Sequence, residues 1–147
     1  MQELEITLNI CIANTFLMYF KAHSYHWNVE GANFAEAHGF LGDFYEELHG
    51  AVDPFAEELR SLGEYYAPLS LAEIKEYGTI EEDTSKPADF KAMLSNLQED
   101  NNKIVDSLNK LFDLSTSNKK QGLANFAADR LDAHAKHGWM LRSYLKG

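Results

Sequence analysis

Residues 23–57 read HSYHWNVEGANFAEAHGFLGDFYEELHGAVDPFAE, and this stretch decides how the rest of the chain is interpreted. It contains two histidines, His26 and His38, followed by two carboxylates, Asp53 and Glu57, that stand one helical turn apart. Imidazole nitrogen combined with carboxylate oxygen, without a thiolate, suits a hard or borderline cation such as iron. The stretch therefore predicts a metal site that uses these four side chains.

The spacing of the four residues limits how such a site can form. If residues 34–60 form one helix, His38 and Asp53 lie about 22 Å apart along its axis, because each residue adds about 1.5 Å. A single ion cannot bind both ends within one chain. Either the two ends are unrelated, or a second copy runs antiparallel and brings its carboxylates to the histidines of the first.

Working outward, apolar residues at helical spacing predict four long helices over residues 3–28, 34–62, 87–114 and 119–146. A long connection over residues 63–88 holds a short helix at residues 70–77. No segment has a comparable strand pattern. The chain has 147 residues, of which 45% are hydrophobic, enough for one domain with a core. We expect a single all-α domain, residues 1–147, with the long crossover of a ferritin-like four-helix bundle.

Three local features refine the helix ends. Pro54 falls inside the second helix, where proline normally costs about 3 kcal/mol. Because the apolar pattern resumes in phase on both sides, we expect one continuous helix. Asn33 with Glu36, and Ser70 with Glu73, have the spacing of capping boxes and predict two helix starts.

Composition excludes several classes of function. The net charge of -10 argues against nucleic acid, because contacts to phosphates need Lys and Arg. Cys11 is the single cysteine, so a disulfide framework within the chain is excluded and a reducing cytoplasm fits. The longest apolar stretch, residues 8–20, is too short and too polar to span a bilayer. We expect a cytoplasmic protein that binds neither DNA nor a membrane.

The motif HWNVEG at residues 26–31, the histidine twelve residues after the first, and D-x-x-x-E fifteen residues beyond resemble the Dps family, the miniferritins of starved cells. LG at residues 62–63 and HGWMLRSYL at residues 137–145 extend the resemblance over nearly the whole chain.

The resemblance implies a ferroxidase that stores iron and protects against oxidative damage. It implies a hollow homo-oligomer, a dodecamer assembled from two-fold dimers. Two adjacent Fe(II) positions would lie at the dimer interface: one would use His26 of one subunit with Asp53 and Glu57 of the next, and the other would use His38 with an aspartate. Hydrogen peroxide, or dioxygen less readily, would oxidise the iron, and ferric mineral would collect inside the shell. Zinc also suits the same ligands.

One position departs from the family pattern. The family places an aspartate four residues after the second histidine, where this chain has Gly42. Asp43 is a substitute ligand only if this turn of helix distorts, because one residue rotates a helix position by about 100°. Two interpretations stay open: a ferroxidase with one iron position weakened, or a structural or metal-sequestering shell without useful ferroxidase activity.

A competing metal motif lies within the second helix. Glu46-Glu47-Leu48-His49 contains E-x-x-H, which occurs in di-iron sites inside a single four-helix bundle. That architecture needs a second such motif on another helix. The last helix offers His134 and His137 but no second E-x-x-H, so the interface site is favoured over an intra-bundle site.

Overall fold

The computed structural model describes residues 1–86 and 89–147 of the chain. Its elements are α1 (Gln2–Asn28), α2 (Phe34–Leu62), α3 (Leu71–Tyr77), α4 (Phe90–Ser117) and α5 (Gln121–Leu145). The described residues contain no strand, so the predicted all-α class is confirmed. No helix among them is long and apolar enough to cross a membrane.

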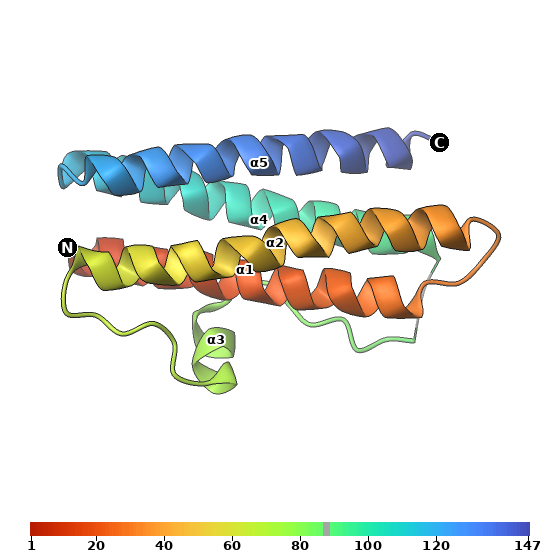
Figure 1. The fold of residues 1–147 in the computed structure, drawn as a ribbon, viewed down its shortest axis with the longest axis horizontal. Helices are drawn as coiled ribbons and strands as arrows, with labels where there is room; N and C mark the ends of the chain where they lie inside the picture. The colour runs from red at the N-terminus through yellow and green to blue at the C-terminus, as the bar shows by residue number, and fades with distance from the viewer. Residues whose placement is uncertain (87–88) are drawn as a thin grey trace.

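The four long helices form two antiparallel hairpins, α1 with α2 and α4 with α5 (Figure 1). The crossover leads back along the outside of the bundle, so α2 and α4 run in the same direction (Figure 1). The short helix α3 lies outside the bundle beside α1. One long crossover between two hairpins is the arrangement that the sequence predicted for a ferritin-like bundle.

The core follows the predicted apolar stripes. On α2, the fully buried side chains recur every three or four residues and face the bundle interior. They are Leu41, Phe44, Leu48, Phe55 and Leu59. Helix α1 is buried on several sides, because it packs against α2, α4 and α3. This explains why its apolar residues are not confined to one stripe.

Helix α2 is continuous through Pro54, as predicted. Pro54 is exposed, so its ring points away from the packed face of the helix. Because the helix is unbroken, His38 and Asp53 lie on one rigid element, about 22 Å apart along its axis. The fold therefore keeps the two ends of the predicted metal site apart within one chain.

One of the two predicted capping boxes is confirmed. The Ser70 hydroxyl accepts a hydrogen bond from the Glu73 amide at 3.1 Å, and the Glu73 carboxylate accepts one from the Leu69 amide at 2.8 Å. The other was wrong: Asn33 precedes α2 but its side chain makes no capping hydrogen bond. Glu36 instead accepts a hydrogen bond from the Tyr144 hydroxyl at 3.2 Å.

The predicted start of the third long helix, near Pro87, lies outside the described residues. Helix α4 is described from Phe90, and Asp89 caps it by accepting from the Ala92 amide at 2.8 Å. Its predicted end at residue 114 was three residues early. The helix continues to Ser117, and within it the buried Ser115 hydroxyl donates to the Leu111 carbonyl at 2.6 Å. The chain turns at Lys119, with φ 58, and α5 begins at residue 121 rather than 119.

The crossover is attached to α1 by a buried asparagine. Asn14 accepts hydrogen bonds from the amides of Thr79, at 2.8 Å, and Ile80, at 3.3 Å. Its amide nitrogen donates to the Thr79 hydroxyl at 2.9 Å. Both partners lie more than sixty residues away in sequence, so one side chain fixes the return path of the crossover.

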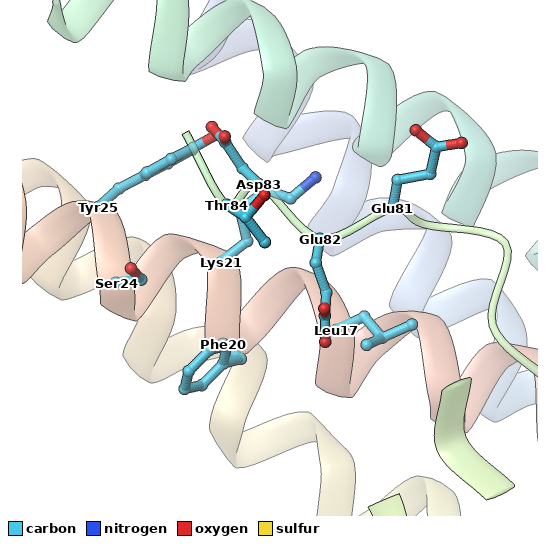
Figure 2. A pocket seen from close by; sticks show the side chains of 9 residues that line it. All are labelled: Leu17, Phe20, Lys21, Ser24, Tyr25, Glu81, Glu82, Asp83 and Thr84. Atoms are coloured by element: carbon cyan, nitrogen blue, oxygen red, sulfur yellow. The ribbon is translucent and has the colours of Figure 1, made fainter. Parts of the chain in front are cut away.

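A cavity of about 170 Å³ lies between α1 and the next part of the crossover (Figure 2). Tyr25 extends across it and donates to the Asp83 carboxylate at 2.6 Å. The cavity is also lined by Lys21, which is buried and lies 2.8 Å from an Asp100 carboxylate oxygen on α4. These contacts hold the crossover, α1 and α4 together.

Replacement of Asn14 by Ala removes the acceptor of two backbone amides at once. We expect Asn14→Ala to lower the free energy of unfolding by about 2 kcal/mol, because the buried Ile80 amide loses its partner and a buried unpaired amide costs about 1–3 kcal/mol. Urea unfolding at a fixed protein concentration measures the change. Asn109→Ala, at an exposed position of α4, is the control. Equal stability of the two variants would contradict the role of Asn14.

Candidate metal centre

His26 and His38 come together where α1 ends and α2 begins. Their rings stack with centroids 3.7 Å apart and an interplanar angle of 20°. The Nδ1 atom of His26 lies 2.7 Å from the His38 carbonyl oxygen, and the Nδ1 atom of His38 lies 2.8 Å from the His26 carbonyl oxygen. Each histidine is therefore hydrogen-bonded to the backbone of the other.

These reciprocal hydrogen bonds fix the protonation of the rings. A carbonyl oxygen only accepts, so both Nδ1 atoms carry hydrogen and donate. In a neutral imidazole the second nitrogen then holds a lone pair, so the Nε2 atoms of His26 and His38 are candidate metal donors. Histidines that bind metal usually donate their other nitrogen to a carbonyl or carboxylate in this way. The pair therefore has the hydrogen bonding that is typical of metal-binding histidines.

Gly42 lies directly beside this pair. A Cβ atom at residue 42 would be 3.1 Å from Cε1 and 3.3 Å from Nδ1 of His26. Such contacts are tighter than side chains normally allow, so the glycine provides the space in which the His26 ring lies. The absence of a carboxylate at residue 42 therefore goes with the position of the His26 ring, because any side chain there would crowd the ring.

Asp43, the predicted substitute ligand, lies on another side of α2. It lines a groove of about 470 Å³ between α2 and α5, together with Lys136 and Met140. Helix α2 runs regularly through Gly39 and Gly42, so the distortion that would turn Asp43 toward His26 is not present.

The predicted carboxylates, Asp53 and Glu57, are exposed on α2 and distant from the histidine pair. Among the described residues of one chain, no three His, Cys, Asp or Glu side chains gather closely enough to hold a metal. One chain therefore brings His26 to His38 but does not bring Asp53 or Glu57 to them.

Aromatic side chains enclose the inner side of the histidine pair. His23 stacks on Tyr45 with ring centroids 3.7 Å apart, and its Nδ1 lies 3.0 Å from the Tyr19 hydroxyl. Burial, and then the nearby His26 and His49, lower the pKa of His23. The ring centroids of Trp27 and His23 lie 4.1 Å apart, and Trp27 is 57% exposed. The motif gave no indication of Tyr19 and Tyr45, although Tyr19 and His23 have the i, i+4 spacing of neighbours on one helix face.

The bundle interior contains a polar network instead of the E-x-x-H site. Glu46 and His49 are exposed, so the intra-bundle interpretation of that motif is wrong. Glu47 is partly exposed at the groove between α2 and α5, and it forms an ion pair with the buried Arg130 of α5 at 2.5 Å. His137 Nε2 donates to the same carboxylate at 2.6 Å. Burial alone would raise the pKa of Glu47, but hydrogen bonds from His137 and Arg130 outweigh it and hold the pKa well below its usual range.

Arg130 also determines which ring nitrogen of His134 carries hydrogen. A guanidinium only donates, so the Arg130 contact of 2.9 Å makes His134 Nε2 an acceptor. His134 Nδ1 then donates to the Asn101 side-chain oxygen at 2.8 Å, and the Asn101 amide donates back to the His134 carbonyl at 3.0 Å. Burial and then Arg130 lower the pKa of His134 to about 3. The guanidinium of Arg130, a cation of the chain itself, thus occupies the bundle interior.

Comparisons with known proteins show the family to which the chain belongs. A family model described as a ferritin-like domain matches residues 7–147. The DNA protection during starvation protein of Brevibacillus brevis is 31% identical over 147 residues, which cover 99% of this chain and 96% of the relative. An uncharacterized low temperature-induced protein of Nostoc sp. is 31% identical over 142 residues, covering 95% and 78%.

Solved structures match as well. A Dps protein from Bacillus brevis superposes with a TM-score of 0.92 at 30% identity, over 98% of this chain and 95% of that one. Antigen TpF1 from Treponema pallidum gives a TM-score of 0.94 at 27% identity, over 99% and 93%. The fold and the family match define a ferritin-like protein. Within that class, the chain belongs to the Dps family.

The buried His134 predicts a specific loss of stability in acid. Its pKa is about 3 in the folded chain and about 6.5 when unfolded, so it stabilises the fold fully above pH 6.5 and progressively less below. We expect His134 to reduce the free energy of unfolding by about 2 kcal/mol between pH 6.5 and 5, at about 1.4 kcal/mol per pH unit.

Urea unfolding of the wild type and of His134→Asn, at fixed protein concentration across this range, measures the effect. The variant is expected to be less stable at pH 7 and to depend less on pH. Parallel pH dependence of the two proteins would contradict the assignment.

Proposed function

We propose that this protein binds Fe(II) as a substrate between two subunits, oxidises it, and stores the ferric product in a hollow shell. The observation that supports this most is the division of donors within one chain. His26 and His38 present Nε2 atoms at one end of α2, and Asp53 and Glu57 present oxygens about 22 Å away. An antiparallel second copy completes two equivalent sites at once, which is the symmetry of an isologous dimer.

In this mechanism each side chain has a defined role. His26 and His38 hold the ion through nitrogen, and Asp53 and Glu57 of the partner subunit supply oxygen. The carboxylates favour the ferric state, because hard, charged oxygen ligands suit the harder ion. Each Fe(II) gives up one electron. Hydrogen peroxide takes two electrons and two protons and leaves as two waters, whereas dioxygen is the slower oxidant.

The family membership supports the larger assembly. We propose a cytoplasmic dodecamer built from two-fold dimers, with the mineral inside. The net charge of -10 gives no support to DNA binding. Zinc would compete with iron for the same nitrogen and oxygen donors.

Complementation between variants tests whether the site is shared. His26→Ala and Asp53→Ala chains are each expected to lose rapid Fe(II) oxidation. Mixed dimers of the two regain one intact site, which combines wild-type His26 and wild-type Asp53 from different chains. Random pairing of equal amounts restores about a quarter of the wild-type sites, since half the dimers are mixed and each holds one good site.

The measurement is peroxide-driven Fe(II) oxidation, followed by ultraviolet absorbance, of co-expressed variants whose mixing is verified by native mass spectrometry. Mixed dimers as inactive as the separate variants would exclude a shared site. A double variant with both substitutions in one chain is the control, because no pairing can rescue it.

A second candidate function, a metal-sequestering shell without useful oxidation, is favoured by Gly42. Comparison of Gly42→Asp with Gly42→Ala separates the two candidates, because both add a Cβ against His26 but only one adds a carboxylate. If the present site is functional, both variants slow Fe(II) oxidation by about fivefold, which corresponds to about 1 kcal/mol. Oxidation by Gly42→Asp far faster than by the wild type would instead favour the sequestering shell.

A further inference from the structure

Glu46 and His49 are the glutamate and the histidine of the E-x-x-H motif. Neither residue belongs to the polar network of the bundle interior or to the proposed iron site. They stand three residues apart on α2, a spacing that places both on one side of a helix. Both are exposed, and among the described residues neither side chain has a hydrogen-bond or ion-pair partner. The His49 ring lies 4.8 Å from the Tyr19 ring, and the Tyr19 hydroxyl is hydrogen-bonded to His23.

The two residues point in the same direction as the proposed iron ligands. On a helix with about 100° per residue, His38 and Glu57 bound a sector of about 100°. Glu46 and His49 both fall inside this sector, and the buried Phe44 lies on the opposite side. A partner subunit that covers the iron ligands therefore also covers Glu46 and His49.

The register of the antiparallel dimer places them at its centre. The histidine pair lies at the level of residues 38–42 of α2, because His26 is bonded to the His38 carbonyl and lies against Gly42. Its carboxylate partners are at residues 53 and 57. The two-fold axis must pass midway between these levels, which falls between residues 47 and 48. Glu46 then lies opposite His49 of the partner subunit.

From this geometry we propose a second, inter-subunit metal site on the two-fold axis, formed by Glu46 and His49 of both subunits. It presents two imidazole nitrogens and two carboxylate oxygens, a set that suits a four-coordinate divalent ion such as zinc. Cobalt(II) and Fe(II) accept the same donors. The ion would stabilise the dimer and with it the shared iron sites. This site rests on the antiparallel dimer of the proposed function.

Cobalt(II) titration tests the axial site by itself. The full chain carrying Asp53→Asn and Glu57→Gln serves as the background, so that the iron site lacks its carboxylates. We expect one Co(II) per two subunits, with the strong visible absorption of a four-coordinate ion. His49→Asn or Glu46→Gln is expected to weaken binding at least tenfold. Glu58→Gln, on α2 outside the sector, is expected to leave it unchanged.

The outcomes separate this inference from the proposed function. If variant mixing restores iron oxidation but Co(II) binding is absent, or is equal in His49→Asn, only the axial site is wrong. Glu46 and His49 would then form ion pairs across the axis without a metal. If native mass spectrometry shows a monomer, both the axial site and the shared iron site are wrong.

Discussion

The candidate metal centre depends on two hydrogen bonds that cross the α1–α2 hairpin, from the Nδ1 of each of His26 and His38 to the carbonyl of the other. They require α1 to end and α2 to begin within a few residues of each other. In return they fix both rings, stack them, and leave both Nε2 atoms free to bind. The contacts that join the two helix ends thus also orient the two histidines that we propose as metal ligands.

The second constraint is the length and continuity of α2. A helix unbroken by Pro54 holds the nitrogen ligands and the oxygen ligands apart, so neither end can complete a site within its own chain. The bundle interior offers no alternative, because Arg130 already pairs with Glu47 and donates to His134. Removing the partner of a buried charge is costly, which makes this internal cation difficult to replace by a metal. This is why we propose that metal binds on the outer face of α2, against a second subunit.

Much of the fold could be predicted because it follows from local patterns. The apolar spacing predicted both ends of α2 at the residues where they are observed, and Ser70 with Glu73 marked the start of α3. Glu36, predicted to join a capping box with Asn33, is bonded instead to Tyr144 of a distant helix. The late end of α4 is a separate, local case, because Ser115 bonds to Leu111 within the same helix. The histidine pair was visible in the motif spacing. The reciprocal carbonyl bonds, the crowding at Gly42 and the role of Arg130 were not, because each depends on residues brought together only by the fold.

The central claim is that one ion takes nitrogen from one subunit and oxygen from another. Anomalous X-ray diffraction from crystals grown with Fe(II) without oxygen tests this most directly. The account predicts an iron peak within coordination distance of Nε2 of His26 and His38 and of the carboxylates of Asp53 and Glu57 of the partner subunit. An iron peak whose ligands all belong to one chain, or residues 26 and 57 of neighbouring subunits far beyond coordination distance, would contradict it.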